Sequence, residues 1–225
     1  MADFAIAYAP LKEFEGGYDN DPDDRGGETY AGIARNFFPK WEGWKLIDQI
    51  KKTSRTKAEI ARACKADHLL QDYVSAWYRS EWFDALGLGQ LPQILANEIF
   101  EQAVNLGKAG NGRKVQIICN AYNRGSNGKA LFTDLVVDGA IGPKTLAALK
   151  LILESKARAE NIVHALNCMQ GAHYLELAAK KPSQRKYTVG WMKRTHCEAA
   201  GDTGAVQIRH PPCGDCGDCG DGCRA

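Results

Sequence analysis

EGGYDNDPDDRGGETYAGI, residues 15–33, is the stretch that sets the fold of the first part of the chain. Before it, apolar residues recur at helix spacing over residues 4–14, and the glycine pair 16–17 predicts where this helix stops. Pro10 lies inside the helical pattern and predicts a kink or a late start. Residues 19–32 are rich in Asp, Gly and Pro, which predicts a loop or a short hairpin.

Helical patterns dominate the rest of the chain. Thr56 and Glu59 have the spacing of a capping box, which predicts that a long helix begins there and extends to Trp77. Pro92 suits the first turn of a further helix, and Gly107 suits its end. The later predicted helices carry residues 115–122, 143–154 and 157–180. We therefore predict a mainly α fold with one short hairpin.

The overall composition is that of an ordinary globular protein, with 44% apolar and 25% charged residues among 225. No run approaches the roughly 18 to 20 apolar residues that a membrane span requires. We also predict no nucleic-acid binding, because the body of the chain has no basic helix, no pattern of stacking aromatics and no zinc-finger spacing.

Glu15 directly follows the first predicted helix. The unpaired carbonyls at a helix C-terminus carry partial negative charge, which favours a protonated carboxylic acid over a carboxylate. Phe14 and Tyr18 flank Glu15, and desolvation by them would act in the same direction. A carboxylic acid that stays neutral near pH 7 is suited to protonating a glycosidic oxygen. Glu15 is therefore the predicted catalytic acid.

A second carboxylate is available in the acidic loop that follows. Asp24 is the first choice, because an ionised carboxylate there could stabilise an oxocarbenium-like transition state or orient a water molecule. Thr29 could position that water by hydrogen bonding. Asp21 is the second choice. The structural alternative for these acidic residues is that they cap turns and face solvent.

This pattern resembles the glycoside hydrolase family 108 N-acetylmuramidases, which include phage endolysins and secretion-activator proteins. The residues that carry the resemblance are Glu15–Tyr18, Asn20–Pro22, Asp24, Gly26–Thr29, Gly32–Ile33, Trp41–Trp44, Tyr78–Trp82 and Ala103–Gly107. The resemblance implies a lysozyme-like helical fold, Glu15 as catalytic acid, and cleavage of the β-1,4 bond between N-acetylmuramic acid and N-acetylglucosamine. It implies no cofactor and no metal.

The resemblance also indicates which residues bind substrate, and it shows two differences between this chain and the family pattern. Tyr18, Tyr30 and Asn105 are the predicted substrate-binding residues. Family members usually have Asp where this chain has Glu101, so the role of that position is open. Glu15, Asp24 and Thr29 follow the order of the active-site hairpin in phage-type lysozymes, with one residue fewer between the last two. The aromatic residues Trp41, Trp44, Trp77, Tyr78 and Trp82 are either sugar platforms or core residues.

The second half has a resemblance of its own. Asp138–Thr145 and Gly190–Arg194 look like parts of the helical peptidoglycan-binding domain that accompanies this muramidase domain. The alternative for the first segment is purely structural, since its Gly and Pro residues form a turn before a helix. We predict a catalytic domain at residues 1–95 and a peptidoglycan-binding-like domain at 96–196, either separate or sharing one continuous core.

Residues 197–225 form a tail rich in Cys, Gly and Asp, and we expect it to be disordered. Cys213, Cys216, Cys219 and Cys223 have the spacing of an iron–sulfur ligand run, and zinc is a chemical alternative. The tail has no apolar residues that would shield a cluster. The favoured interpretation is therefore a solvated or disulfide-paired tail without metal.

The expected partner is the glycan strand of peptidoglycan, and two other functions compete with the muramidase. One is a lytic transglycosylase, and the other is a non-catalytic peptidoglycan-binding factor in secretion or assembly. The first ten residues lack the basic and apolar regions of a signal peptide. We therefore expect synthesis in the cytoplasm and, for a phage protein, release to the wall through a holin or cell lysis.

Overall fold

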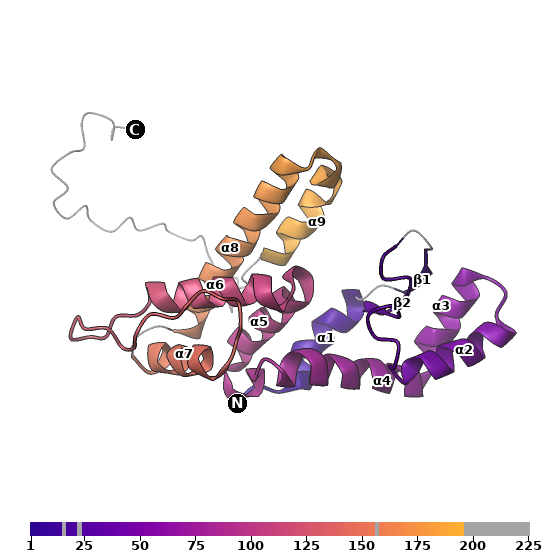
Figure 1. Ribbon diagram of the computed structural model, residues 1–225, viewed down its shortest axis with the longest axis horizontal. Helices are drawn as coiled ribbons and strands as arrows, with labels where there is room; N and C mark the ends of the chain where they lie inside the picture. The colour runs from indigo at the N-terminus through magenta and orange to yellow at the C-terminus, as the bar shows by residue number, and fades with distance from the viewer. Residues whose placement is uncertain (15–16, 22–23, 156–157, 196–225) are drawn as a thin grey trace, which may run out of the picture.

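A computed structural model describes residues 1–14, 17–21, 24–155 and 158–195 (Figure 1). Its first elements are α1 (Phe4–Phe14), β1 (Tyr18–Asn20), β2 (Glu28–Tyr30), β3 (Ile33–Ala34), α2 (Gly43–Thr53), α3 (Lys57–Ala66) and α4 (His68–Tyr78). They are followed by the π-helical turn η1 (Arg79–Asp84), the 3₁₀ turn η2 (Leu88–Gln90), α5 (Gln93–Leu106), α6 (Lys108–Ala121), α7 (Pro143–Ser155) and α8 (Ala159–Lys180). The last described elements are η3 (Pro182–Tyr187), α9 (Thr188–Met192) and η4 (Lys193–Thr195). The predicted mainly α, lysozyme-like fold with a short hairpin is confirmed.

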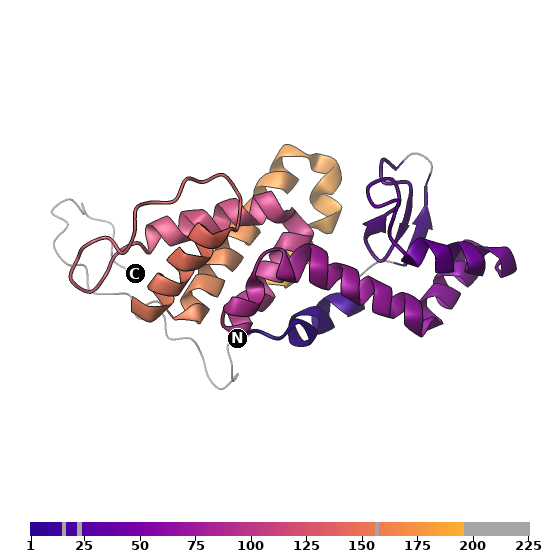
Figure 2. The same cartoon turned by 60° about the horizontal axis from the view of Figure 1, so that its bottom comes forward.

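The molecule is elongated, and α4 runs along it from the hairpin toward α5 (Figure 1). The hairpin, α2 and α3 occupy one end, and α6, α7 and α8 occupy the other. In both views the hairpin and the α8–α9 pair project to the same side of the central helices (Figure 2). No helix in the described ranges combines the length and apolar character that a bilayer span demands.

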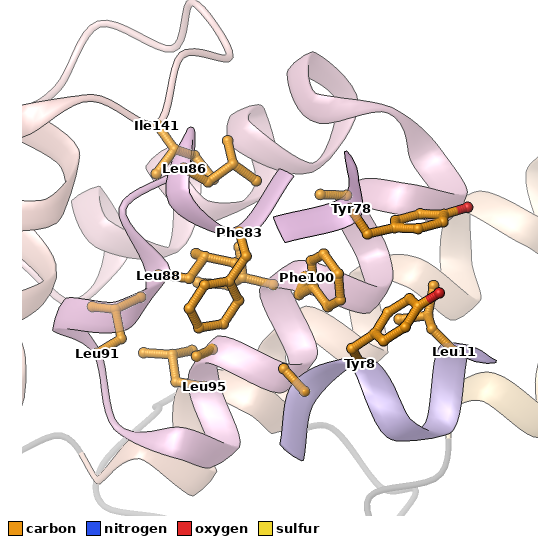
Figure 3. Packing of buried hydrophobic residues seen from close by; sticks show 14 of the residues in the cluster. Tyr8, Leu11, Tyr78, Phe83, Leu86, Leu88, Leu91, Leu95, Phe100 and Ile141 are labelled. Carbon is orange, nitrogen blue, oxygen red and sulfur yellow. The ribbon is translucent and has the colours of Figure 1, made fainter. Parts of the chain in front are cut away.

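The Asp3 carboxylate accepts a hydrogen bond from the Ala5 amide at 2.7 Å and caps the start of α1. The helix runs from Phe4 through Pro10 to Phe14, so the late start, one of the two alternatives predicted for Pro10, is wrong. Its buried face packs into an aromatic cluster (Figure 3), in which the Tyr8 and Tyr78 ring centroids lie 5.4 Å apart. This packing fixes α1 against α4 and α5, and with them the position where α1 ends.

One predicted helix is two helices in the structure. The capping box is confirmed, since the Thr56 side chain accepts from the Glu59 amide and the Glu59 carboxylate accepts from the Thr56 amide. However, α3 ends at Ala66, so the predicted continuous helix to Trp77 is wrong. Asp67 explains the break, because its side chain accepts from the Leu70 amide at 2.9 Å and caps α4 as a new helix.

The core is one continuous buried cluster that extends from Ala7 in α1 to Leu166 in α8. It crosses the expected domain boundary at residues 95/96, which lies within α5. Leu86 from the first predicted domain and Ile141 from the loop before α7 both belong to this cluster (Figure 3). The division into two domains therefore stays a prediction, and one packed core holds the predicted parts together.

The turn at Asp138–Thr145 is held against α6 by hydrogen bonds to Gln116 and by a close backbone approach at Gly112. The Gln116 side chain donates to the Asp138 carboxylate at 2.7 Å and accepts from the Gly139 amide at 2.8 Å. Gly112 faces the same turn so closely that a Cβ on it would overlap the Gly139 carbonyl oxygen. Gly139 itself has a φ of +89°, which favours glycine. These contacts support the structural interpretation of this turn.

Gly112→Ala is expected to lower the free energy of unfolding by about 2 kcal/mol, because the added methyl group must push backbone away from backbone. Urea denaturation followed by circular dichroism measures the change. Gly110→Ala is the matched control in the same helix, since its Cβ would meet only the Leu106 Cβ at 3.8 Å. That control should gain about 0.5 to 1 kcal/mol from helix propensity. Equal stability of the two variants would contradict the close approach of Gly112 to the Gly139 carbonyl.

Candidate active site

Glu15, the predicted catalytic acid, lies outside the described residues. The described chain reaches Phe14, the last residue of α1, and resumes at Gly17, just before β1. In sequence, Glu15 therefore follows directly on the end of a helix that the aromatic cluster holds in place. Its role as the acid stays a prediction.

The hairpin brings Asp24 and Thr29 together around Gly26. A Cβ built on Gly26 would lie 3.7 Å from an Asp24 carboxylate oxygen and 3.6 Å from the Thr29 hydroxyl. The Asp24 carboxylate accepts from the Gly26 amide at 3.2 Å, and the Thr29 hydroxyl donates to the Gly27 carbonyl at 3.0 Å. Asp24 is exposed. The predicted second carboxylate and the predicted water-positioning hydroxyl thus occupy one small region of the turn.

Glu28 holds the hairpin to α2. Its carboxylate accepts from the Arg35 guanidinium at 2.6 Å, from the Lys51 ammonium at 2.7 Å and from the Tyr18 hydroxyl at 2.8 Å. Arg35 in turn donates to both carboxylate oxygens of Asp48, at 2.8 and 2.7 Å. The Glu28 side chain is only 9% exposed. Since Thr29 is the next residue along β2, this network also positions the Thr29 hydroxyl.

The charge state of Glu28 follows from these contacts. Burial by itself disfavours the carboxylate, but the hydrogen bonds from Lys51, Arg35 and Tyr18 outweigh it, so the pKa of Glu28 lies below its usual value. The pKa of Tyr18 is raised, first by burial and then by its hydrogen bond to Glu28. The network therefore consists of two carboxylates, Glu28 and Asp48, balanced by the cations Arg35 and Lys51, with the Tyr18 phenol bonded to Glu28.

The two tyrosines predicted to bind substrate are buried, with 6% of Tyr18 and 4% of Tyr30 exposed. The Tyr18 hydroxyl donates to Glu28, and the Tyr30 hydroxyl accepts from the Gln71 side chain at 2.7 Å. The Tyr18 bond therefore joins the two strands of the hairpin, and the Tyr30 bond holds the hairpin against α4. Direct contact with substrate stays a prediction for each.

Two cavities flank the last turns of α1. One of about 680 Å³ lies between α1, the hairpin, α3 and α4, and its lining includes Lys12, Gly17 and Tyr30. The other, of about 670 Å³, lies between α1, α5 and the segment from η3 to η4. We call the second the α1–α5–α9 cleft. Its lining includes Leu11 from the first half and Trp191 from the second, so both halves of the chain build it.

Asn105, the third predicted binding residue, lines the α1–α5–α9 cleft together with Glu101. The Asn105 amide donates to the Glu101 carboxylate at 2.6 Å, and Arg194 donates to Asn105 at 2.7 Å and to Glu101 at 3.1 Å. Gln170 donates to the other Glu101 oxygen at 3.2 Å. Glu101 is therefore the centre of a polar cluster that joins α5 to α8 and η4.

Burial raises the pKa values of both carboxyl groups in this cleft. For Glu101 the hydrogen bonds from Gln170, Arg194 and Asn105 act in the opposite direction without cancelling the effect of burial. For Glu98 the hydrogen bond from Gln102 likewise offsets only part of it. Burial in this wall of the cleft therefore disfavours the charged form of both groups.

Sequence reasoning did not bring these distant residues together. Arg194 lies 93 residues from Glu101, and no local pattern links the two positions. Asp48 and Lys51 lie three residues apart on one face of α2, and this spacing indicates an ion pair. It does not indicate that Glu28 of the hairpin joins them. Among the aromatic candidates, Trp44 and Tyr78 are buried, and the remaining three pack partly buried against the core: Trp41, Trp77 and Trp82.

Within the described ranges, no group of three or more His, Cys, Asp and Glu side chains is arranged to hold a metal ion. Cys64 and Cys119 are buried free thiols, and Cys168 is an exposed free thiol. The four C-terminal cysteines considered above as alternative metal ligands lie outside the described residues, as does the whole 197–225 tail.

Known proteins resemble this chain in sequence and in fold. Residues 9–107 match the sequence model of the glycosyl hydrolase 108 family, and residues 115–196 match that of a predicted peptidoglycan domain. Among solved structures, the fold is similar to that of SagA from Brucella abortus, with a TM-score of 0.51 and 24% identity over 85% of this chain and 88% of that one. No curated protein sequence matches the chain. The first part of the chain is therefore similar to the glycosyl hydrolase 108 family and the second part to a peptidoglycan domain, a combination that supports a peptidoglycan hydrolase.

Proposed function

We propose that this protein is an N-acetylmuramidase that hydrolyses the β-1,4 bond between N-acetylmuramic acid and N-acetylglucosamine in peptidoglycan. The observation that carries the proposal is the hairpin, which gathers Asp24 and Thr29 around Gly26 directly after the end of α1. The family supplies the glycoside hydrolase chemistry, and the matched peptidoglycan domain supplies the substrate class.

In this mechanism Glu15 protonates the oxygen of the leaving sugar. Asp24 is exposed and accepts a hydrogen bond from the Gly26 amide. On the opposite side of the scissile bond, it stabilises the positive charge that develops at the anomeric carbon or orients the attacking water. The Thr29 hydroxyl, fixed by its bond to the Gly27 carbonyl, helps to position that water.

The direct experiment is digestion of purified peptidoglycan by the full-length chain, with the products separated and identified by mass spectrometry. The proposal predicts muropeptides with reducing N-acetylmuramic acid ends. Anhydro-muramic ends would instead identify a lytic transglycosylase. Binding without cleavage, on walls of several chemotypes, would identify a non-catalytic peptidoglycan-binding factor.

Asp24→Asn is expected to lower kcat about a hundredfold, because the neutral amide cannot stabilise positive charge or act as a base. The change should leave stability almost unaltered, since the amide oxygen can still accept from the Gly26 amide. Release of soluble muropeptides measures the rate, and a thermal melt measures stability.

Asp19→Asn is the matched control on the same hairpin, where the exposed carboxylate pairs with Lys57 at 2.7 Å. It should keep full activity, since an exposed ion pair contributes little. Asp21→Asn tests the second choice for the carboxylate. A large loss in Asp21→Asn with normal activity in Asp24→Asn would move the role to Asp21, and normal activity in both would count against a second carboxylate.

A further inference from the structure

The α1–α5–α9 cleft has a polar wall that is already satisfied. Arg194 and Gln170 both donate to Glu101, and Asn105 bridges Arg194 and Glu101. These contacts close the wall formed by α5 and η4. The other side chains that line the cleft remain available for recognition.

The segment from η3 to α9 brings aromatic rings to this cleft, in a series that extends from the core to the surface. Trp191 stacks on the buried Tyr174 ring with centroids 5.3 Å apart, and Tyr187 lies 5.8 Å from Trp191. Tyr187 is 47% exposed. A ring series anchored at one end in the core and open at the other is suited to contact with the apolar face of a sugar.

Two lysines flank these rings. Lys186 and Lys193 both line the cleft, and the Lys186 ammonium lies 4.9 Å from the centroid of the Tyr187 ring. Within the described part of the chain, no ion pair involves either lysine. Three basic side chains (Lys186, Lys193 and Arg194) and two acidic ones (Glu98 and Glu101) line the cleft, so its lining has a formal net charge of +1. Because Arg194 is paired with Glu101, the surplus comes from the two lysines.

The aromatic rings and the two lysines together indicate which part of peptidoglycan the cleft binds. The sugars of the strand are uncharged where the lactyl carboxyl of muramic acid is bound to a peptide as an amide. The free carboxylates belong to the stem peptide. A cleft with an open ring series and two cations therefore matches a sugar and its attached peptide together. The cavity on the other side of α1 matches less well, because its tyrosines, Tyr8 and Tyr30, are buried.

We propose that the α1–α5–α9 cleft binds a peptide-bearing N-acetylmuramic acid unit, with Tyr187 and Trp191 against the sugar and Lys186 and Lys193 at the stem-peptide carboxylates. This rests on the proposed function, because it makes the cleft a subsite of the same strand that is cleaved beside the hairpin. Leu11 lines the cleft four residues before Glu15 in the sequence, so the cleft reaches toward the end of α1. The second half then completes the substrate groove and is not only a separate anchor.

The test uses soluble, uncrosslinked glycan strands that carry stem peptides, and the same strands with their carboxylates capped as methylamides. Binding is measured by calorimetry in a Glu15→Gln chain, and cleavage is measured in the wild-type background. The double variant Lys186→Ala, Lys193→Ala should bind uncapped strands about tenfold more weakly and cleave them with a correspondingly higher KM. Capping should weaken binding of the unaltered cleft by the same factor and should not weaken binding of the double variant further.

The matched control is Lys180→Ala, Lys181→Ala, which removes the same charge from the end of α8 outside the cleft. It should bind both strands normally and respond to capping in full. Tyr187→Ala should weaken binding to capped and uncapped strands equally. Equal binding of both strands by the unaltered cleft, or a full capping effect in the double variant, would overturn the inference. Because binding and cleavage are separate readouts, absence of cleavage by wild type would refute the proposed function and leave the binding result decisive for the cleft.

Discussion

Glu15→Gln is expected to lower the rate of peptidoglycan hydrolysis about a thousandfold, within the range that general acid catalysis contributes. Glutamine has nearly the same size and can still form hydrogen bonds, but it has no proton to give to the leaving oxygen. The physical basis is the position of Glu15 in the chain, immediately after α1 ends at Phe14. Partial negative charge at a helix C-terminus favours a neutral acid over a carboxylate, which is the sequence-based argument for Glu15. Initial rates of muropeptide release, measured from pH 4 to 8, test this expectation.

Glu13→Gln is the matched control, because it removes an equal charge two residues earlier in the chain. It should retain wild-type rates and the wild-type pH profile. The wild-type rate should fall at high pH as the acid loses its proton, while the residual rate of Glu15→Gln should not follow that titration. A Glu15→Gln chain that is folded and more than a tenth as active as wild type would remove Glu15 from the mechanism.

Glu28→Gln is expected to lower the free energy of unfolding by about 3 kcal/mol, the lower end of the cost of breaking a buried ion pair. The loss of the carboxylate leaves Lys51 without its closest partner and takes one of two partners from Arg35. The lower end applies because each cation is 32% exposed and water can reach it. Chemical denaturation at pH 7 measures the change.

The stabilisation by Glu28 is expected to depend on pH. The pKa of Glu28 is lowered in the folded chain, so its contribution to stability is present above the unfolded pKa of about 4.5 and is lost as pH falls through the folded value. The difference between wild type and Glu28→Gln should therefore shrink below about pH 4.5. Glu42→Gln is the control, since its pair with Lys45 is exposed and should contribute less than about 1 kcal/mol. Equal losses in the two variants would show that the Glu28 network does not stabilise the hairpin.

The helices could be predicted where local signals are strong. Gly107 ends α5 with a φ of +79°, and the capping box at Thr56 starts α3, as their sequences indicate. The sequence pattern does not predict the break at Asp67, because the apolar spacing continues across it. Only the hydrogen bond from the Leu70 amide to the Asp67 side chain shows that a new helix begins there. Helix α2 at Gly43–Thr53 was not predicted, although its buried residues Trp44 and Ile47 lie three apart.

The site could be predicted only in part, for a similar reason. Asp24 and Thr29 lie close in sequence, so a hairpin is enough to bring them together. The Glu28 network needs α2 to pack beside the hairpin, and the α1–α5–α9 cleft needs Arg194 to reach Glu101 across 93 positions. Such contacts depend on tertiary packing, which no local spacing encodes.

The measurement that tests the central claim most directly is digestion of peptidoglycan by the wild-type chain in water enriched in ¹⁸O. A muramidase of the proposed kind adds solvent oxygen to the C1 carbon of the muramic acid at each cleaved bond. We predict reducing muropeptides that carry one heavy oxygen at this position, seen by mass spectrometry. Products that end in anhydro-muramic acid without solvent oxygen would contradict hydrolysis, and with it the roles proposed for Asp24 and Thr29.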